Sequence, residues 1–293
     1  MNLELSLADL SRLASLSSNG NLRLGSEEVS ARGGLEALSK VVHERYFQGR
    51  TGRAQGGGRA SGDSGLVAHL THAAHGSAHW ETGWRLAKAD EGWAFVSNGR
   101  LCLFLDEPGL WSPGDARLGQ AVAVRMPRVR ENERPHRFTL FGGGGAAPSA
   151  RFTKYFATVA LESAAALVSF FTSRATEGLA FSLCLVNEPS DFFRRDALCL
   201  DAGPAAAEQV QKLLLDFARA NPGALKEDAE APLFTQTVAP GLASVESLGT
   251  EDVGDGFGQR RARWVAEAVW AGLHAGEKTS SEWRARLVAM GLA

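Results

Sequence analysis

The sequence predicts an α+β protein, and three observations support this class. The 293 residues are 44% hydrophobic and 22% charged, which is ordinary for a globular chain that can bury a sizeable core. Residues 79–129 alternate apolar and polar side chains between turn residues, as antiparallel strands do. Residues 150–293 alternate short strand-like runs with periodic helical segments. We therefore expect N-terminal helices with an antiparallel sheet in residues 1–141, and a strand–helix–strand subdomain with helices in residues 150–293.

Three helices are expected before the antiparallel strands. Leucines between Leu3 and Leu16 predict a short amphipathic helix, and the apolar face of residues 27–47 predicts a second. Residues 64–75 predict a third helix, which Gly76 would end. Between the second and third helices, residues 48–65 are rich in glycine and arginine and predict a surface loop.

The remaining elements follow from periodicity and stop signals. The last strand of the antiparallel set is QAVAVRMPRV, which Pro127 stops, and the glycine-rich residues 142–149 are expected to separate the two subdomains. The second half then predicts strands at KYFATVAL, AFSLCLVN and DALCLDAG, with a helix at ESAAALVSFFTSRA. Two long helices and a final helix follow, and the last begins with a capping-box pattern from Thr279 to Glu282.

The charge and hydropathy of the chain argue against two classes of partner. The net charge of −2 gives no electrostatic basis for binding nucleic acid or an anionic membrane surface. No run approaches the ~20 apolar residues that span a bilayer. The N-terminus lacks the pattern of a Sec-type signal peptide, so we expect a cytoplasmic protein.

The cysteines and histidines do not predict a disulfide framework or a metal site. Three cysteines lie in apolar, strand-like runs and are expected to be buried, reduced thiols: Cys102, Cys184 and Cys199. Four histidines follow one another closely, but no carboxylate or cysteine lies at ligand spacing beside them: His69, His72, His75 and His79. We expect a polar helix face there and no bound metal.

A series of short motifs occurs in an order that resembles one known family. The motifs are HERYFQGR (43–50), WETGWRLAKADEGWAFV (80–96), VRMPR (124–128), KYFAT (154–158), AFSLC (180–184), FFRRD (192–196) and FGQRRAR (257–263). This order resembles the HopA family of type III effectors and the related LanY-type proteins of class V lanthipeptide clusters. Arg128 and Cys184 stand where lysine is common in that family, and Lys154 and Thr158 stand where arginine and asparagine are usual.

The resemblance implies a reaction on a peptide. In class V lanthipeptide and thioamitide pathways, a kinase-like phosphotransferase is thought to phosphorylate Ser or Thr of a precursor peptide. The HopA-like protein is then expected to eliminate phosphate and leave a dehydroamino acid. The implied partners are the precursor peptide and the kinase-like protein, in a hetero-complex, and no cofactor is required. Two alternatives stay open: a non-catalytic peptide- or kinase-binding partner, and a secreted type III effector.

Phosphate β-elimination requires a base for the α-proton, cations for the phosphate and an acid for the leaving group. Arginine suits phosphate because its planar fork binds two oxygens. Lysine with a lowered pKa suits the base, and histidine suits the acid. The candidate catalytic residues are Lys154 as the base, His136 as the acid, and His43. The candidate phosphate-binding residues are Arg125, Arg128, Arg194, Arg261 and Arg263.

The candidate arginines also have structural interpretations. Arg125 and Arg128, separated by a proline turn, form either a phosphate clamp or a solvated basic edge. Arg194 and Arg195 precede Asp196, and one of the two is expected to form a structural Arg–Asp pair. The arginines at the start of the 258–274 helix oppose its macrodipole, so they predict either a bound anion or pairing with Glu251 or Asp255.

The candidate lysine and histidines also have alternative interpretations. Lys154 is either the base or an edge-strand lysine that protects against aggregation. His136 is either the acid or a surface-loop histidine, and His43 faces along the second helix near Arg45 and Tyr46.

Overall fold

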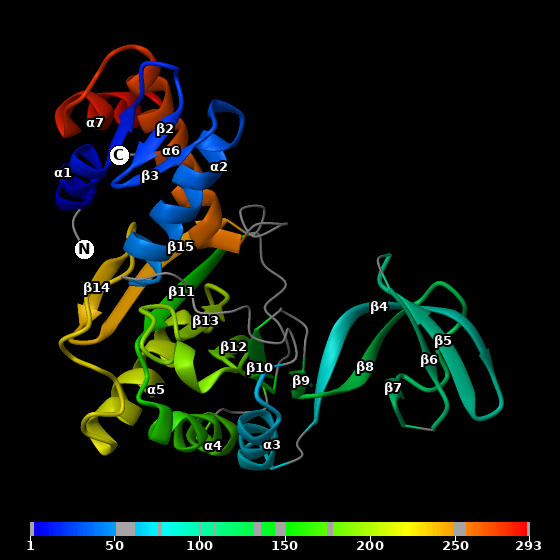
Figure 1. Ribbon diagram of the computed structural model, residues 1–293. Coiled ribbons are helices and arrows are strands. Elements are labelled where there is room, and N and C mark those ends of the chain that lie inside the picture. Colours follow the sequence, from blue (N-terminus) through cyan, green and yellow to red (C-terminus); the bar gives the residue numbers. More distant parts are fainter. Residues whose placement is uncertain are drawn as a thin grey trace.

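The computed structural model describes residues 3–50, 62–75, 78–99, 101–107, 109–131, 136–143, 151–174, 178–248 and 256–291. These residues form three parts (Figure 1): a central seven-stranded sheet with helices, a helical part at one end, and a five-stranded sheet that projects to the side. The mixture of helices and antiparallel strands confirms the predicted α+β class.

The central sheet has the strand order β14-β15-β11-β13-β12-β10-β9. Its strands are β9 (Val129–Glu131), β10 (Arg137–Phe141), β11 (Arg151–Ala157), β12 (Phe181–Val186), β13 (Leu198–Ala202), β14 (Gln236–Ala239) and β15 (Leu242–Leu248). One face packs against α3 (Ser64–Ala73), α4 (Ala164–Arg174) and α5 (Ala207–Ala220), which lie below it in Figure 1. Two short 3-10 helices, η2 (Leu161–Ser163) and η3 (Pro189–Asp191), complete this part. Leu183, Leu200 and Phe171 are among the fully buried side chains of this core.

The helical part joins the beginning and the end of the chain. It contains α1 (Leu3–Leu13), α2 (Ala31–Val41), η1 (Val42–Phe47), α6 (Gly256–His274) and α7 (Ser280–Ala289). A small sheet lies beside them, made of β1 (Ala14–Leu16), β2 (Leu22–Leu24) and β3 (Glu27–Val29). Buried side chains from both ends of the chain, such as Leu38, Val269 and Trp283, form one core. The expected capping box is present at α7, where the Glu282 carboxylate accepts a hydrogen bond from the Thr279 backbone N–H (2.9 Å).

The projecting sheet has the order β6-β5-β4-β8-β7. Its strands are β4 (Ala78–Asp90), β5 (Trp93–Ser97), β6 (Cys102–Leu105), β7 (Trp111–Ser112) and β8 (Ala121–Pro127). One face carries a small apolar core that includes Trp84, Val96 and Val124. The antiparallel strands predicted for residues 79–129 are therefore confirmed, as is the end of the last strand at Pro127.

Several local expectations were wrong. Residues 27–47 do not form one helix: Val29 pairs with Leu22 in the small sheet, and the helix starts only at Ala31. Cys102 is exposed, because it lies on the outer face of β6 and not in a core. The loop expected at residues 48–65 and the boundary expected at 142–149 lie largely outside the described residues. No described helix combines the length and hydropathy that crossing a bilayer would require.

Candidate functional site

The second face of the central sheet is buried and carries both polar and aromatic side chains. Cα partners in antiparallel strands point to the same face, so Phe141, Ser182, Asp201 and Lys154 form one row across four strands. Lys154 is 2% exposed, and its Nζ donates a hydrogen bond to Oδ1 of Asp201 (2.8 Å). Because β11 lies between β13 and β15, Lys154 is not an edge-strand lysine, and that interpretation was wrong. The side chain of the predicted base forms a buried ion pair.

The two arginines of the predicted proline-turn clamp lie in different environments. Arg125 is exposed on β8, opposite Trp80 of β4. Arg128 is buried beside β10, where its carbonyl accepts a hydrogen bond from the Phe141 N–H (2.8 Å). The Nε of Arg128 has no hydrogen-bond partner among the described residues. Four strand spacings of ~4.8 Å separate Arg128 from Lys154, so the two cannot grip one phosphate group.

Arg194 forms the structural Arg–Asp pair. Its Nε and Nη2 donate to the two carboxylate oxygens of Asp196 (2.8 and 2.7 Å). Arg137 donates to the same carboxylate (2.6 Å), and Arg50 donates to the neighbouring Asp191 (2.6 Å). Burial acts to raise the pKa of Asp196, but the guanidinium groups of Arg194 and Arg137 outweigh it and hold this pKa well below its usual range. The guanidinium of Arg194 is thus occupied by protein carboxylates.

His43 lies next to this charged cluster, on an unusual segment of helix. Helix α2 continues without a break into η1, a π-helix that begins at Val42. Such single-turn π-helices are rare and frequently occur at functional sites. Burial lowers the pKa of His43 to about 4; Asp196 opposes this shift, and nearby arginines such as Arg194 add to it. The imidazole is therefore neutral at physiological pH and can accept a proton.

A groove of about 400 Å³ runs between the α2–η1 segment and α6. Its lining residues are Leu35, Glu36, Ser39, Lys40, His43, Glu44, Gln259 and Arg263. Close packing of the two helices brings these side chains together. A Cβ added at Gly258 would lie 2.4 Å from Cε1 of Phe47, so only glycine lets α6 approach η1 this closely.

Each of the two cations that line the groove lies close to a carboxylate, and both cations are themselves exposed. Lys40 Nζ lies 3.9 Å from Oε1 of Glu44, and Arg263 Nε donates to Oε1 of Glu267 (3.1 Å). Exposed ion pairs of this kind contribute about 0–1 kcal/mol. A phosphate that offers charge-assisted hydrogen bonds can therefore compete for both side chains.

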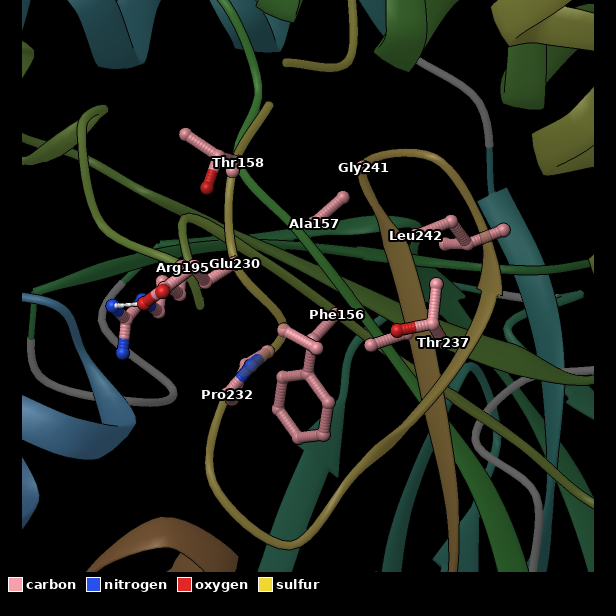
Figure 2. Close-up of a pocket in the computed structure, with 12 residues that line it drawn as sticks. Phe156, Ala157, Thr158, Arg195, Glu230, Pro232, Thr237, Gly241 and Leu242 are labelled. Carbon is pink, nitrogen blue, oxygen red and sulfur yellow. Dashed lines mark hydrogen bonds and ion pairs between the residues drawn. The ribbon is translucent and has the colours of Figure 1, made fainter. Parts of the chain in front are cut away.

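A second pocket, shown in Figure 2, lies at the end of β11. Phe156, Thr158, Arg195 and Glu230 line it, and Arg195 forms an ion pair with Glu230. The Oγ1 of Thr158 is buried without a hydrogen-bond partner among the described residues. The volume of about 20 Å³ is enough for one water molecule and too small for a phosphorylated side chain. We therefore place the candidate site in the groove at His43.

The other predicted residues lie outside the groove. The Arg261 guanidinium carbon is 4.3 Å from the Trp264 ring centroid, a cation–π contact. His136 precedes β10 with a φ of 61°, and its carbonyl accepts a hydrogen bond from the Asn187 N–H (3.3 Å). The partners expected for the α6 arginines, Glu251 and Asp255, lie outside the described residues. Among the described residues, no cluster of His, Cys, Asp and Glu is arranged to hold a metal ion.

The structure thus brings together His43 and Arg263 of the predicted set. It adds Lys40 and Gln259, which were not predicted from the sequence. A signal for both was present, because residues three and four apart on a helix share a face. Lys40 precedes His43 by three residues, and Gln259 precedes Arg263 by four.

Comparison with known proteins identifies relatives of the chain. Residues 129–292 match the model of the HopA1 effector protein family. The effector protein from Pseudomonas syringae pv. tomato strain DC3000 is 12% identical with a TM-score of 0.41, and the match covers 88% of this chain and 92% of that one. The effector protein from Pseudomonas syringae pv. syringae strain 61 is 13% identical with a TM-score of 0.41, covering 87% and 93%. No curated protein sequence matches the chain.

Proposed function

Starting from the fact that the chain belongs to the HopA1 effector protein family, we propose that it is a phosphoserine/phosphothreonine lyase acting on a ribosomally made precursor peptide. The observation that carries the proposal is the groove in which a neutral histidine, His43, lies with the cations Lys40 and Arg263. This is the combination that phosphate elimination requires: a proton acceptor beside groups that bind a phosphate.

The proposed reaction needs only these side chains. The phosphorylated Ser or Thr side chain enters the groove, and Lys40 and Arg263 turn from Glu44 and Glu267 to phosphate oxygens. His43 accepts the α-proton, the Cα–Cβ double bond forms, and the Cβ–O bond breaks with its electron pair leaving on phosphate. The protonated imidazole then returns its proton to phosphate or solvent, and dehydroalanine or dehydrobutyrine remains.

In the free protein His43 is a weaker base than an ordinary histidine, and a bound phosphate would offset this. The surroundings of His43 disfavour the imidazolium before the reaction, as the pKa of about 4 shows. A bound phosphate dianion would stabilise the imidazolium that forms when the α-proton is transferred. The charge that develops in the groove is therefore compensated there, which is the arrangement that lowers a barrier.

The test uses a peptide first phosphorylated by a kinase and verified by mass spectrometry. Incubation with the protein should cause loss of phosphoric acid, and His43→Gln and Arg263→Gln should slow this loss by about 100-fold or more. His69→Gln on α3 and Arg219→Gln on α5 are the matched controls, since both residues are exposed and remote from the groove. Unchanged turnover in His43→Gln would refute the assignment.

One observation supports a second function, a non-catalytic partner of a peptide-modifying complex. Lys154, at a strand position where the family usually has arginine, is closed into a buried pair with Asp201 and cannot reach a peptide. In that case the protein would bind the phosphopeptide or the kinase-like phosphotransferase without turnover. Binding of phosphopeptide with no loss of phosphate over several hours would favour this function over the lyase.

A further inference from the structure

The five-stranded sheet carries a cluster of aromatic rings on the face opposite its core. Trp93 and Phe95 of β5 lie beside Phe104 of β6, with ring centroids 5.6 Å (Trp93–Phe95) and 5.1 Å (Phe95–Phe104) apart. Phe95 is 40% exposed and Phe104 is 55% exposed. Lys88 of β4 places its Nζ 5.3 Å from the Trp93 ring centroid.

The same face is mainly cationic. The register places Lys88 opposite Phe95, and it places Arg85 and Arg125 on this face of β4 and β8. It also places one carboxylate, Asp90, at the end of β4. Among the described residues of these paired strands, Lys88 and Arg85 lie near the rings with Asp90, and Arg125 lies further along the same face, opposite Trp80.

No described helix covers this face, because the sheet projects away from the rest of the molecule (Figure 1). The sheet also precedes the region matched by the family model, which begins at residue 129. Contiguous exposed apolar patches with a polar rim mark interaction sites on soluble proteins. We propose that the face formed by Arg85, Lys88, Trp93, Phe95, Phe104 and Arg125 is the docking surface for an extended, acidic peptide segment with apolar side chains.

Charge and geometry select this partner. An extended chain presents every second side chain to one side, so a segment whose sheet-facing positions alternate between apolar residues and carboxylates can meet both the rings and the cations of this face. The edge strand β6 also offers unpaired backbone groups to a further strand. Single-stranded nucleic acid is the other ligand that basic and aromatic groups bind, but tight binders neutralise about 6–10 phosphates, and this face has three cations.

Binding of an acidic segment to this surface does not depend on the proposed lyase reaction. The identification of that segment as part of the precursor peptide does rest on the proposed function. A segment held on the projecting sheet would tether the peptide and raise the effective concentration of its phosphorylated residues at the groove.

The experiment measures fluorescence anisotropy of the full chain with three unphosphorylated probes: a Glu-Ser-Leu-Ser repeat (the Glu–Leu peptide), a Lys-Ser-Leu-Ser repeat (the Lys–Leu peptide) and oligodeoxythymidine. In the two peptides the charged and apolar residues share one side of an extended chain. We expect the Glu–Leu peptide to bind at least about tenfold more tightly than either other probe. Phe104→Ser and Lys88→Glu should each weaken this binding by about tenfold. The controls are Val288→Ser and Lys212→Glu, which change exposed residues on α7 and α5.

Equal binding of the Lys–Leu peptide, preferential binding of oligodeoxythymidine, or an equal loss in the control variants would overturn the proposal. Phe95→Ser replaces Phe104→Ser if thermal unfolding shows that the latter does not fold. The probes carry no phosphate, so failure of the lyase assay leaves this result intact. Conversely, loss of docking leaves turnover of a short phosphopeptide as a separate test of the groove.

Discussion

The imidazole ring of His43 stacks on the phenyl ring of Phe47, with the ring centroids 5.6 Å apart and the ring planes at 16°. Phe47 in turn contacts Phe156 of β11 and Phe257 of α6, with centroids 5.5 and 6.1 Å away. One side of the histidine is thus fixed against an aromatic cluster that joins the helical part to the central sheet. The desolvation that this packing causes is the largest contribution to the lowered pKa of His43.

The lowered pKa of His43 predicts a pH-dependent stability. The folded protein binds this proton only near pH 4, whereas the unfolded chain binds it below the ordinary value of 6.5. Between these values the unfolded state holds more protons, so the free energy of unfolding falls as the pH falls. The loss should reach about 3 kcal/mol at the lower end of this window. Urea unfolding at fixed ionic strength, from pH 7 to pH 4, measures it.

The matched comparison is His43→Gln, which cannot titrate. Its stability should depend less on pH in this window than that of the parent chain, and the difference between the two curves isolates His43 from carboxylates such as Glu81. Parallel curves would contradict the assignment of a buried, neutral imidazole.

Substitution of Gly258 by alanine should force apart the two helices that form the groove. An alanine Cβ there would lie 2.4 Å from the Phe47 ring, so α6 and η1 must separate. Overpacking of this kind costs about 1–3 kcal/mol, and it should also slow phosphate elimination because the groove widens. Gly33→Ala is the control: the new Cβ would lie 3.6 Å from Val29, an ordinary contact, and α2 should become slightly more stable. Thermal unfolding of both variants checks the contrast.

Much of the fold was predictable because local patterns dominate it. The helix at α5 and the buried strands β12 and β13 have the apolar periodicity of their class, and the structure confirms them. The three-residue strands β1, β2 and β3 were not predicted. Three residues are too few to show a period, and these strands form because Leu22 packs into a core made by the two ends of the chain. Such long-range packing leaves no local signal.

The candidate site was less predictable than the fold. The motifs and their chemistry pointed to His43 and Arg263, but they pointed equally to Arg194, which protein carboxylates occupy. Sequence separation hides such partners: Arg137 and Asp196 meet only because β10 pairs with β12, and β12 leads into the turn at Asp196. Lys40 lies on the same helix face as His43, so the spacing of these two residues in the sequence could have predicted that both line the groove.

Arg194 predicts a coupling between the charged cluster and His43. Arg194→Met removes a bidentate partner of the buried Asp196, which should destabilise the fold by about 3–5 kcal/mol. It also removes a cation that lowers the pKa of His43, so that pKa should rise. Urea unfolding gives the first quantity, and NMR titration of the imidazole gives the second. Arg219→Met, which breaks an exposed pair with Asp216, should change neither. A destabilised Arg194→Met with an unmoved His43 pKa would disprove the coupling.

Substitutions in the buried pair of Lys154 and Asp201 can show whether Lys154 has a structural or a catalytic role. Lys154→Met leaves the Asp201 carboxylate buried without its cation, and such losses cost about 3–5 kcal/mol. Replacing both partners by apolar residues, as Lys154→Met with Asp201→Leu, should recover most of this stability because no charge remains buried. If the role is structural, both variants should retain phosphate elimination per folded molecule, measured at a temperature where each is folded. A Lys154→Met variant with parental stability and no turnover would instead identify Lys154 as the base, and His43 would then lose that role.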